Sequence, residues 1–263
     1  HVGAQRDHRP VAVGRRRLSL VLAHMGAQNG PRSLSEIGRA CNMPPSKVHR
    51  YLASFVAAGL VKQQGRSGRY DLGPAALQLG LAALARYNFV NAAADGLSDL
   101  SAETGMTVLL SVWANQGATV VRWERGATPT DTSVGLGTTL PLLNSATGRV
   151  FLAWGAPRAI APVRDAQLRR LARQPGLSLD MEPTQAGVVA LIEQTRARKF
   201  ASVEGRFIPG LVAAAAPVLD WQGEVQAAVT LVGVDPAAIA PGSPQTGSLL
   251  AYCAEKSVMR VSA

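Results

Sequence analysis

Histidine, the side chain most often used for proton transfer near neutral pH, is confined to the N-terminal part of this sequence. The four histidines all lie within the first 49 residues: His1, His8, His24 and His49. The rest of the chain therefore holds no Ser-His-Asp or Cys-His arrangement and no imidazole-bearing metal site. We expect neither histidine-dependent catalysis nor a metal site there.

Other catalytic patterns are weak as well. The Gly-Leu-Gly at residues 135–137 is not a dinucleotide fingerprint, because Leu140 stands where the third glycine should be, and no GxxxxGK[ST] phosphate loop occurs. Glu204 with Asp131 or Glu182 would make a pair of carboxylates, but nothing in their spacing supports a catalytic pair. We predict a protein that binds rather than transforms, without a cofactor.

Basic side chains are more informative, because they are concentrated in one part of the chain. Residues 1–73 hold 12 Lys and Arg against 3 Asp and Glu, whereas residues 74–263 hold 15 against 14. Positive charge confined to one small domain is typical of proteins that bind phosphates. Within this region four polar residues lie close together and are candidates for contacting DNA bases and phosphates: Ser46, Lys47, His49 and Arg50.

Two helices must position these side chains, and the first is predicted to follow Ser33. Ser33 and Glu36 have the spacing of a capping box, in which the hydroxyl accepts from the backbone and the carboxylate reaches back. Leu34, Ile37 and Cys41 then form one apolar stripe.

The second helix is predicted to begin at Pro45, because residues before a proline avoid the α region and proline suits a first helical turn. Val48, Leu52, Phe55 and Val56 then face the core, which leaves the basic residues on the flanks and outer face. The two helices indicate a helix-turn-helix, whose second helix contacts DNA with its N-terminal residues. An amphipathic αα-hairpin with a solvated polar face is the alternative.

Flanking segments complete a winged helix-turn-helix. Residues 15–27 form an amphipathic helix that would pack behind the other two. Residues 60–63 and 69–72 are short strands joined by a Gly-rich loop, and together they form a wing. Its arginines, Arg66 and Arg69, would hold phosphates or enter a minor groove. An ordinary β-hairpin explains the glycines but not the missing acidic residues.

Changes in composition and in predicted secondary structure divide the chain into four parts. We expect a flexible arm over residues 1–14, the winged domain over 15–73, a linker helix over 74–88 and a second domain over 89–263. The linker helix is rich in alanine and leucine, so it should pack against its own domain or against a second copy of the chain.

The second domain is predicted to be α+β with a mainly antiparallel sheet. Its predicted strands are residues 107–113, 118–124, 201–203, 211–219 and 225–234. Its predicted helices are residues 89–103, 146–154, 164–173, 184–199 and 243–259.

A candidate binding site lies in this domain. Small and polar residues at 144–148 open a predicted helix, where free N–H groups favour an anion. The loop at residues 204–210 and the strand residue Thr230 would complete a small-molecule pocket. As the alternative, Ser145 only caps its helix and Thr230 only faces solvent.

The cysteines and the hydropathy of the chain indicate in which cellular compartment the protein acts. Cys41 and Cys253 lie in different predicted domains, which argues against a disulfide and fits a reducing cytoplasm. The chain has no run of about 18 uncharged apolar residues, the length that a membrane span needs. The N-terminus lacks the apolar centre of a signal peptide. We expect a cytoplasmic protein without membrane contact.

Two stretches of this sequence together resemble the IclR-type bacterial transcriptional regulators. LSEIGRACNMPPSKVHRYLASFVAAGLVKQ, with GRYDLGPAALQLG after it, is similar to the family's winged helix-turn-helix. LPLLNSATGRVFLAW and EGRFIPGLVAAAAPVLDWQGEVQAAVTLVG are similar to its effector domain. The resemblance runs from about Arg15 to the end of the chain, and the combination of both signatures makes it specific.

The resemblance implies a GAF-like effector domain and a homodimer or dimer of dimers on a pseudo-palindromic double-stranded DNA operator. It also implies control of catabolic genes by a small organic or aromatic acid. The candidate DNA contacts are Arg32, Ser33, Pro45, Ser46, Lys47, His49, Arg50, Tyr51, Arg66 and Arg69. The candidate effector contacts are Leu142, Asn144, Ser145, Ala146, Gly148, Glu204, Arg206, Leu211, Ala213, Thr230 and Val232.

Three positions depart from the family pattern. Leu143 stands where many members have a histidine, and Val232 replaces a common serine. The loop that is often strongly acidic contains Arg206 after Glu204. We therefore expect a less polar pocket, with Arg206 available for a carboxylate if it turns inward. The alternative function is a metabolite sensor whose winged domain binds a protein partner instead of DNA.

Overall fold

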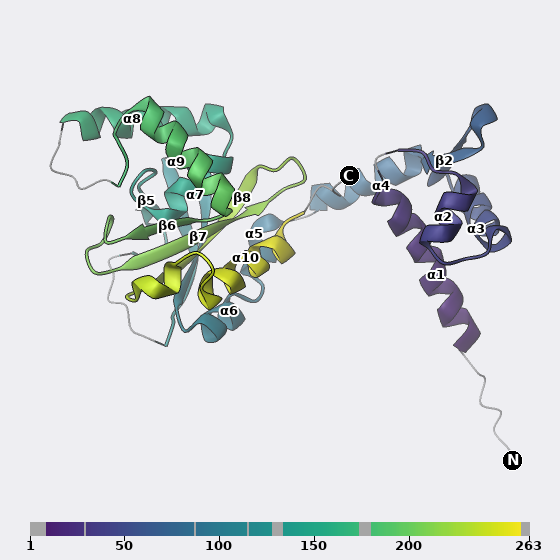
Figure 1. The fold of residues 1–263 in the computed structure, drawn as a ribbon, viewed down its shortest axis with the longest axis horizontal. Coiled ribbons are helices and arrows are strands. Elements are labelled where there is room, and N and C mark those ends of the chain that lie inside the picture. Colours follow the sequence, from purple (N-terminus) through teal and green to yellow (C-terminus); the bar gives the residue numbers. More distant parts are fainter. Residues whose placement is uncertain are drawn as a thin grey trace, which may run out of the picture. The chain divides into compact units, whose positions relative to one another are not determined.

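The computed structural model describes the chain in six segments (Figure 1): residues 9–28, 30–86, 88–114, 116–127, 134–173 and 180–258. The chain divides into two compact units between residues 87 and 88. The first unit has one hydrophobic core, and the second has two, one on each side of its sheet.

The first unit is a helix-turn-helix with a wing. Its described elements are α1 Arg9–Gly26, α2 Leu34–Ala40, α3 Pro45–Ala57, β1 Val61–Gln64, the 3-10 turn η1 Gly65–Ser67, β2 Arg69–Leu72 and α4 Pro74–Arg86. The helix α1 begins ahead of the predicted residue 15, so the expected arm is helical from Arg9 onward. The first eight residues of that arm lie outside the described residues.

The start of α2 and the turn after it follow from local chemistry. The Ser33 N–H donates to Glu36 Oε2 at 2.7 Å and the Glu36 N–H donates to Ser33 Oγ at 3.3 Å, which confirms the capping box. The Met43 N–H donates to the Gly38 carbonyl at 2.9 Å. A Cβ on Gly38 would lie 3.1 Å from the Met43 carbonyl oxygen, so the turn packs tightly on the helix.

The core of this unit joins α1, α2 and α3 to the wing. Its fully buried residues include Val21 of α1, Ile37 of α2 and Leu52 of α3. Val56 was expected in this core, but its side chain is 40% exposed. Each residue turns an α-helix by about 100°, so Val56 lies well round from its buried neighbour Phe55.

The second unit is α+β, as predicted. Its helices are α5 Phe89–Ala94, α6 Leu97–Thr104, α7 Ala146–Trp154, α8 Pro157–Arg173, α9 Gln185–Arg198, the 3-10 helix η2 Pro236–Ile239 and α10 Pro244–Lys256. Its strands are β3 Thr107–Ala114, β4 Gly117–Glu124, β5 Thr139–Leu140, β6 Ala201–Glu204, β7 Val212–Leu219 and β8 Val225–Gly233.

These strands form one six-stranded sheet in the order β5-β4-β3-β8-β7-β6, and every described pairing is antiparallel. Helices α7, α8 and α9 lie on one face, and α5, α6 and α10 lie on the other (Figure 1). The two hydrophobic cores of this unit fill the spaces between the sheet and these two layers.

Two predicted helices differ from the structure. The single helix predicted over residues 89–103 is two helices, because the chain turns at Asp95 and at Gly96, whose φ is +95°. The Tyr252 hydroxyl of α10 donates to the carbonyls of Ala93 and Asp95 at 2.7 and 3.0 Å and so holds this turn. Helix α8 begins at Pro157, ahead of the predicted residue 164, and contains Pro162.

Candidate DNA-binding and effector-binding sites

The N-terminal half of α3 presents the predicted DNA-reading residues. Ser46, His49 and Arg50 are exposed, whereas Lys47 and Tyr51 are half-buried. The first turn of α3 is fully described and holds no acidic residue and no side-chain cap. Because the first N–H groups of a helix form a positive end, this end favours a phosphate.

Two of the candidate DNA contacts also build the wing. Arg32 forms a β-bridge with Tyr70, and its guanidinium lies 3.8 Å from Glu36 Oε1. Arg69 Nη1 donates to the Pro31 carbonyl at 3.4 Å. These contacts fasten the wing to the segment that precedes α2.

Three other candidates lie at the helix starts and at the tip of the wing. Pro45 is the exposed first residue of α3, and Ser33 is engaged in the capping box. Arg66 lies in η1 at the tip of the wing, but its side chain lies outside the described part of the structure.

A cavity of about 560 Å³, a volume that includes its open side, lies in the second unit between the sheet and the start of α7. Its lining is mostly apolar with a few polar groups, which is the usual composition of a small-molecule pocket. It is lined by Thr107, Leu109, Val134, Leu140, Asn144, Ser145, Ala146, Thr147, Val203, Arg206, Phe207, Ile208, Leu211, Val212, Ala213, Thr230 and Val232.

Strand register explains the floor of this cavity. Thr107 pairs with Val232, Val232 with Ala213, and Ala213 with Val203. These four residues therefore form one row across β3, β8, β7 and β6. Partners in register point to the same side of a sheet, so the whole row faces α7.

The polar groups beside this floor are mostly paired. Thr147 of α7 and Thr230 of β8 are buried, and their hydroxyls lie 2.7 Å apart in a hydrogen bond. The Ser145 hydroxyl donates to the Pro141 carbonyl at 2.7 Å and accepts from the Gly148 N–H at 2.9 Å. Ser145 thus caps α7, as predicted, and also lines the cavity.

Asn144 and Arg206 bring further polarity to the cavity. Asn144 Oδ1 is buried and has no hydrogen-bond partner among the described residues. A buried acceptor without a partner is uncommon and stands ready for a donor from a ligand. Arg206 is an exposed residue that also lines the cavity, so a cation stands at its open side.

Three predicted effector contacts lie outside the cavity lining. Leu142 is fully buried in the core. A Cβ on Gly148 would lie 2.2 Å from the Pro141 carbonyl oxygen, so this glycine serves the close packing of α7. Glu204 is exposed, because side chains alternate along β6 and Val203 faces the cavity.

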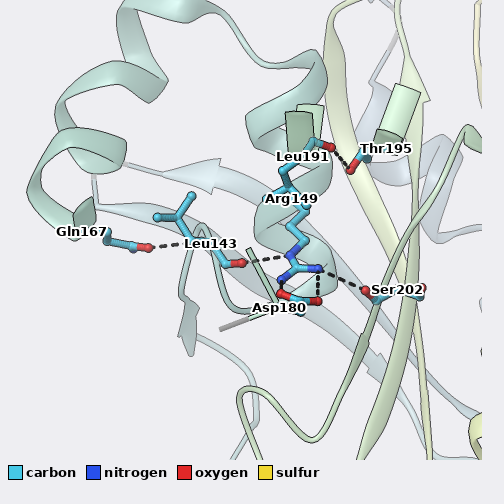
Figure 2. Close-up of polar contacts among 7 residues, drawn as sticks. All are labelled: Leu143, Arg149, Gln167, Asp180, Leu191, Thr195 and Ser202. Atoms are coloured by element: carbon cyan, nitrogen blue, oxygen red, sulfur yellow. Dashed lines mark hydrogen bonds and ion pairs between the residues drawn. The ribbon is translucent and has the colours of Figure 1, made fainter. Parts of the chain in front are cut away.

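A buried arginine that no sequence motif indicated lies beside the cavity (Figure 2). The Arg149 side chain is 4% exposed, and its Nε donates to the Leu143 carbonyl at 2.8 Å. Its Nη1 donates to Asp180 Oδ2 at 2.9 Å and to the Ser202 carbonyl at 3.3 Å, while Nη2 pairs with Asp180 Oδ1. A charged residue within the apolar sequence ATGRVFLAW was the available signal.

The Asp180 carboxyl stays ionised beside this arginine. Burial raises the pKa of Asp180. The hydrogen bonds and charge of Arg149 together lower this pKa by more than burial raises it, so the pKa lies below its usual value. The charge of Arg206 contributes to the same lowering. Asp180 is therefore an anion near two cations at the side of the cavity.

Comparison with known families decides the class of this protein. The family model described as the bacterial transcriptional regulator IclR C-terminal region matches residues 81–256, and the IclR helix-turn-helix domain matches residues 16–65. The chain belongs to the IclR family. The resemblance noted from its sequence motifs is thereby confirmed.

Individual IclR-family proteins match along most of their length. The chain is 27% identical to the transcriptional repressor IclR of Escherichia coli over 81% of this chain and 77% of that protein. It is 28% identical to the HTH-type transcriptional regulator BhcR of Paracoccus denitrificans over 76% of this chain and 70% of that protein. The crystal structure of Pseudomonas aeruginosa HmgR superposes with a TM-score of 0.81, and its sequence is 34% identical, over 95% of this chain and 96% of that chain.

Membership of the IclR family assigns general roles to the two units. The protein is a transcriptional regulator, and the family is one of regulators rather than enzymes. Its helix-turn-helix unit binds DNA and its C-terminal unit binds a small-molecule effector. Within the described residues, no helix is long and apolar enough to cross a membrane, and no cluster of His, Cys, Asp and Glu is arranged to hold a metal ion.

Proposed function

We propose that this IclR-family regulator controls catabolic genes in response to a small organic or aromatic acid, and that it acts in the cytoplasm as a homodimer or dimer of dimers. The observation that carries the proposal is the cavity of about 560 Å³, which combines apolar sides with Asn144 and Arg206. Apolar pockets with a few convergent polar groups are the usual form of small-molecule sites.

The cavity favours a ligand with one charged end. Leu109, Ile208 and Leu211 offer apolar contacts to a ring or a short chain. Arg206 would pair with the carboxylate, since guanidinium groups bind carboxylates in a bidentate manner. Asn144 would accept a hydrogen bond from the ligand.

On the DNA side, the exposed face of α3 would enter the major groove. His49 and Arg50 would reach base edges, and Ser46 with the N-terminal end of α3 would bind a phosphate. Lys47 and Tyr51 would flank these contacts, and Arg66 and Arg69 of the wing would bind the neighbouring backbone or minor groove.

The oligomer would form through α4. Leu77 and Leu81 lie one helical turn apart and are 65% and 56% exposed, which is unusual for large apolar residues. A second copy would cover this stripe and place two α3 helices on a pseudo-palindromic operator. The effector would act by binding one arrangement of the DNA-binding domains more tightly than the other.

A footprinting experiment on the promoter beside the protein's own gene tests the proposal. Wild type should protect a pseudo-palindromic site, and an organic acid should change the protection. Arg50→Ala should lose about 1–3 kcal/mol of specific binding if Arg50 contacts a base, with relaxed preference at one position. Arg158→Ala, which removes an exposed charge from α8 of the other unit, is the matched control.

Two outcomes would contradict this proposal. The first is the absence of any protected site, with or without the acids. The second is binding that does not weaken as salt rises, because phosphate contacts release counterions and lose affinity steeply with salt.

A further inference from the structure

The buried guanidinium of Arg149 joins three segments that are far apart in the sequence (Figure 2). It comes from α7 and contacts the turn before that helix at Leu143, the edge strand β6 at Ser202, and Asp180 before α9. We infer that Arg149 is a positioning residue of the effector pocket, which fixes the start of α7 relative to β6. The inference rests on the effector site proposed above.

The two backbone contacts of Arg149 both end one residue from the pocket. Leu143 precedes Asn144, and Ser202 precedes Val203, and both of these following residues line the cavity. A hydrogen bond to a carbonyl fixes the peptide plane that it shares with the next residue. Arg149 therefore sets the direction from which Asn144 and Val203 approach a ligand.

The chemistry of this contact requires arginine. Guanidinium carries five N–H donors in a planar fork, and Arg149 uses four hydrogen bonds to three different residues. A lysine at this position would keep the charge but lacks the fork that reaches both carbonyls and the carboxylate. Lysine would thus preserve the ion pair with Asp180 and lose the positioning.

Asp180 has a separate part in the arrangement. A buried cation without a partner is strongly unfavourable, and Asp180 supplies the compensating charge from a position that is 34% exposed. Asp180 itself does not line the cavity. Its removal should disturb the pocket only through Arg149.

A second arginine provides a matched control within the same unit. Arg196 of α9 donates from Nε to the Ala153 carbonyl near the end of α7, at 2.7 Å. This bond also joins a side chain to the backbone of α7, but Ala153 does not line the cavity. If Arg149 served only to hold α7 in place, Arg149→Met and Arg196→Met would affect the pocket equally.

The first test is amide hydrogen exchange on the full-length protein without ligand. Arg149→Met should speed exchange in peptides covering residues 141–148 and 200–206 and leave peptides of β4 unchanged. Arg196→Met should leave both pocket peptides as in wild type. Arg149→Lys should exchange like Arg149→Met, and Asp180→Asn should show the same pattern to a smaller extent.

The second test is binding of benzoate, a single-ring carboxylate used as the probe. All four tryptophans lie in the second unit, so their fluorescence reports on that unit alone. Arg149→Met and Arg149→Lys should bind benzoate about tenfold more weakly than wild type, which corresponds to about 1.4 kcal/mol. Arg196→Met should bind within twofold of wild type.

The outcomes separate this inference from the function on which it rests. Unchanged exchange at both pocket peptides in Arg149→Lys would overturn it, as would equal acceleration in Arg149→Lys and Arg196→Met. Wild-type protein that binds neither benzoate nor other small acids would contradict the proposed effector class, and the exchange result would still decide the role of Arg149. If Arg149→Met does not fold, Arg149→Lys and Asp180→Asn carry both tests.

Discussion

Two buried hydroxyl groups join the pocket helix to the sheet. The hydroxyls of Thr147 and Thr230 form a hydrogen bond with each other, with their oxygens 2.7 Å apart. Valine has nearly the same shape as threonine but cannot form a hydrogen bond, so removing one hydroxyl leaves the other buried without a partner. Such an unsatisfied group costs about 1–3 kcal/mol, whereas replacing both partners with apolar groups of the same shape is nearly neutral.

A double-mutant cycle in urea tests this pair. Thr147→Val and Thr230→Val should each lower the free energy of unfolding of the second unit by about 1–3 kcal/mol. The double variant should be more stable than the sum of the two losses implies. Strict additivity would show that the two hydroxyls do not depend on each other.

The Arg149–Asp180 pair predicts a dependence of stability on pH. The pKa of Asp180 in the folded protein is below its usual value, so the carboxylate stabilises the fold above the unfolded pKa, which is about 3.9. This stabilisation is lost as pH falls through the lowered folded pKa. Thermal unfolding at pH 7 should show wild type to be more stable than Asp180→Asn.

The difference between wild type and Asp180→Asn should then narrow in the acid range. Melting temperatures measured from pH 7 down to pH 3 check this sign, and Asp165→Asn, which removes a half-buried aspartate that also pairs with an arginine, serves as the comparison. A difference that grows as pH falls would contradict the assigned pairing.

At the scale of single residues, the sequence predicted part of the cavity lining. Asn144 and Ser145 could be found because a polar cluster before an apolar helix is a local pattern. Arg149 could not be paired with Asp180, because the partners are 31 positions apart and a lone arginine is normally exposed. Glu204 lies outside the cavity lining because of the register of β6, which only the folded sheet determines.

Caps explain which elements could be predicted. Helices preceded by Ser33, Ser145, Thr184 or Ser243 begin where expected, and each of these side chains accepts a hydrogen bond at its helix start. The break at Gly96 was not predicted, although the Asp95-Gly96 dipeptide is a local turn signal. The hydrogen bonds from Tyr252 that hold this turn come from α10, and such tertiary contacts leave no local signal.

The capping box of α2 gives a prediction about one element. Ser33→Ala removes a side-chain acceptor for a backbone N–H and should destabilise the helix-turn-helix unit by about 1 kcal/mol. Ser35→Ala is the control, because the Ser35 hydroxyl contacts that of Ser33 at 3.1 Å but takes no part in the capping box. Chemical denaturation followed by circular dichroism measures the difference. Equal stability of the two variants would contradict the role of the cap.

The exposed stripe of α4 gives a second prediction about an element. Leu77→Gln with Leu81→Gln should weaken self-association roughly tenfold or more for each leucine, because burying a leucine contributes about 1.5–3 kcal/mol. Sedimentation velocity across a range of concentrations measures this. Val189→Gln, at an exposed apolar position on α9, is the control. An unchanged oligomeric state in the double variant would rule out α4 as the interface.

At the scale of the whole molecule, the charge of the chain separates its two functions. The excess of Lys and Arg lies in residues 1–73, within the DNA-binding unit, while the second unit is nearly balanced and holds the cavity. The sequence therefore predicted the order of the two functions along the chain. It could not identify the effector, because the shape of the cavity depends on four strands and a helix that meet only in the fold.

If one molecule links DNA binding to effector binding, each ligand must change the affinity for the other by the same factor. The affinity for a labelled operator fragment is measured by anisotropy with and without a saturating acid, and the affinity for the acid is measured by calorimetry with and without the operator. Both affinity ratios should be equal and lie within about 5–150-fold. Ratios of one in both measurements would show that the DNA site and the effector site are not linked.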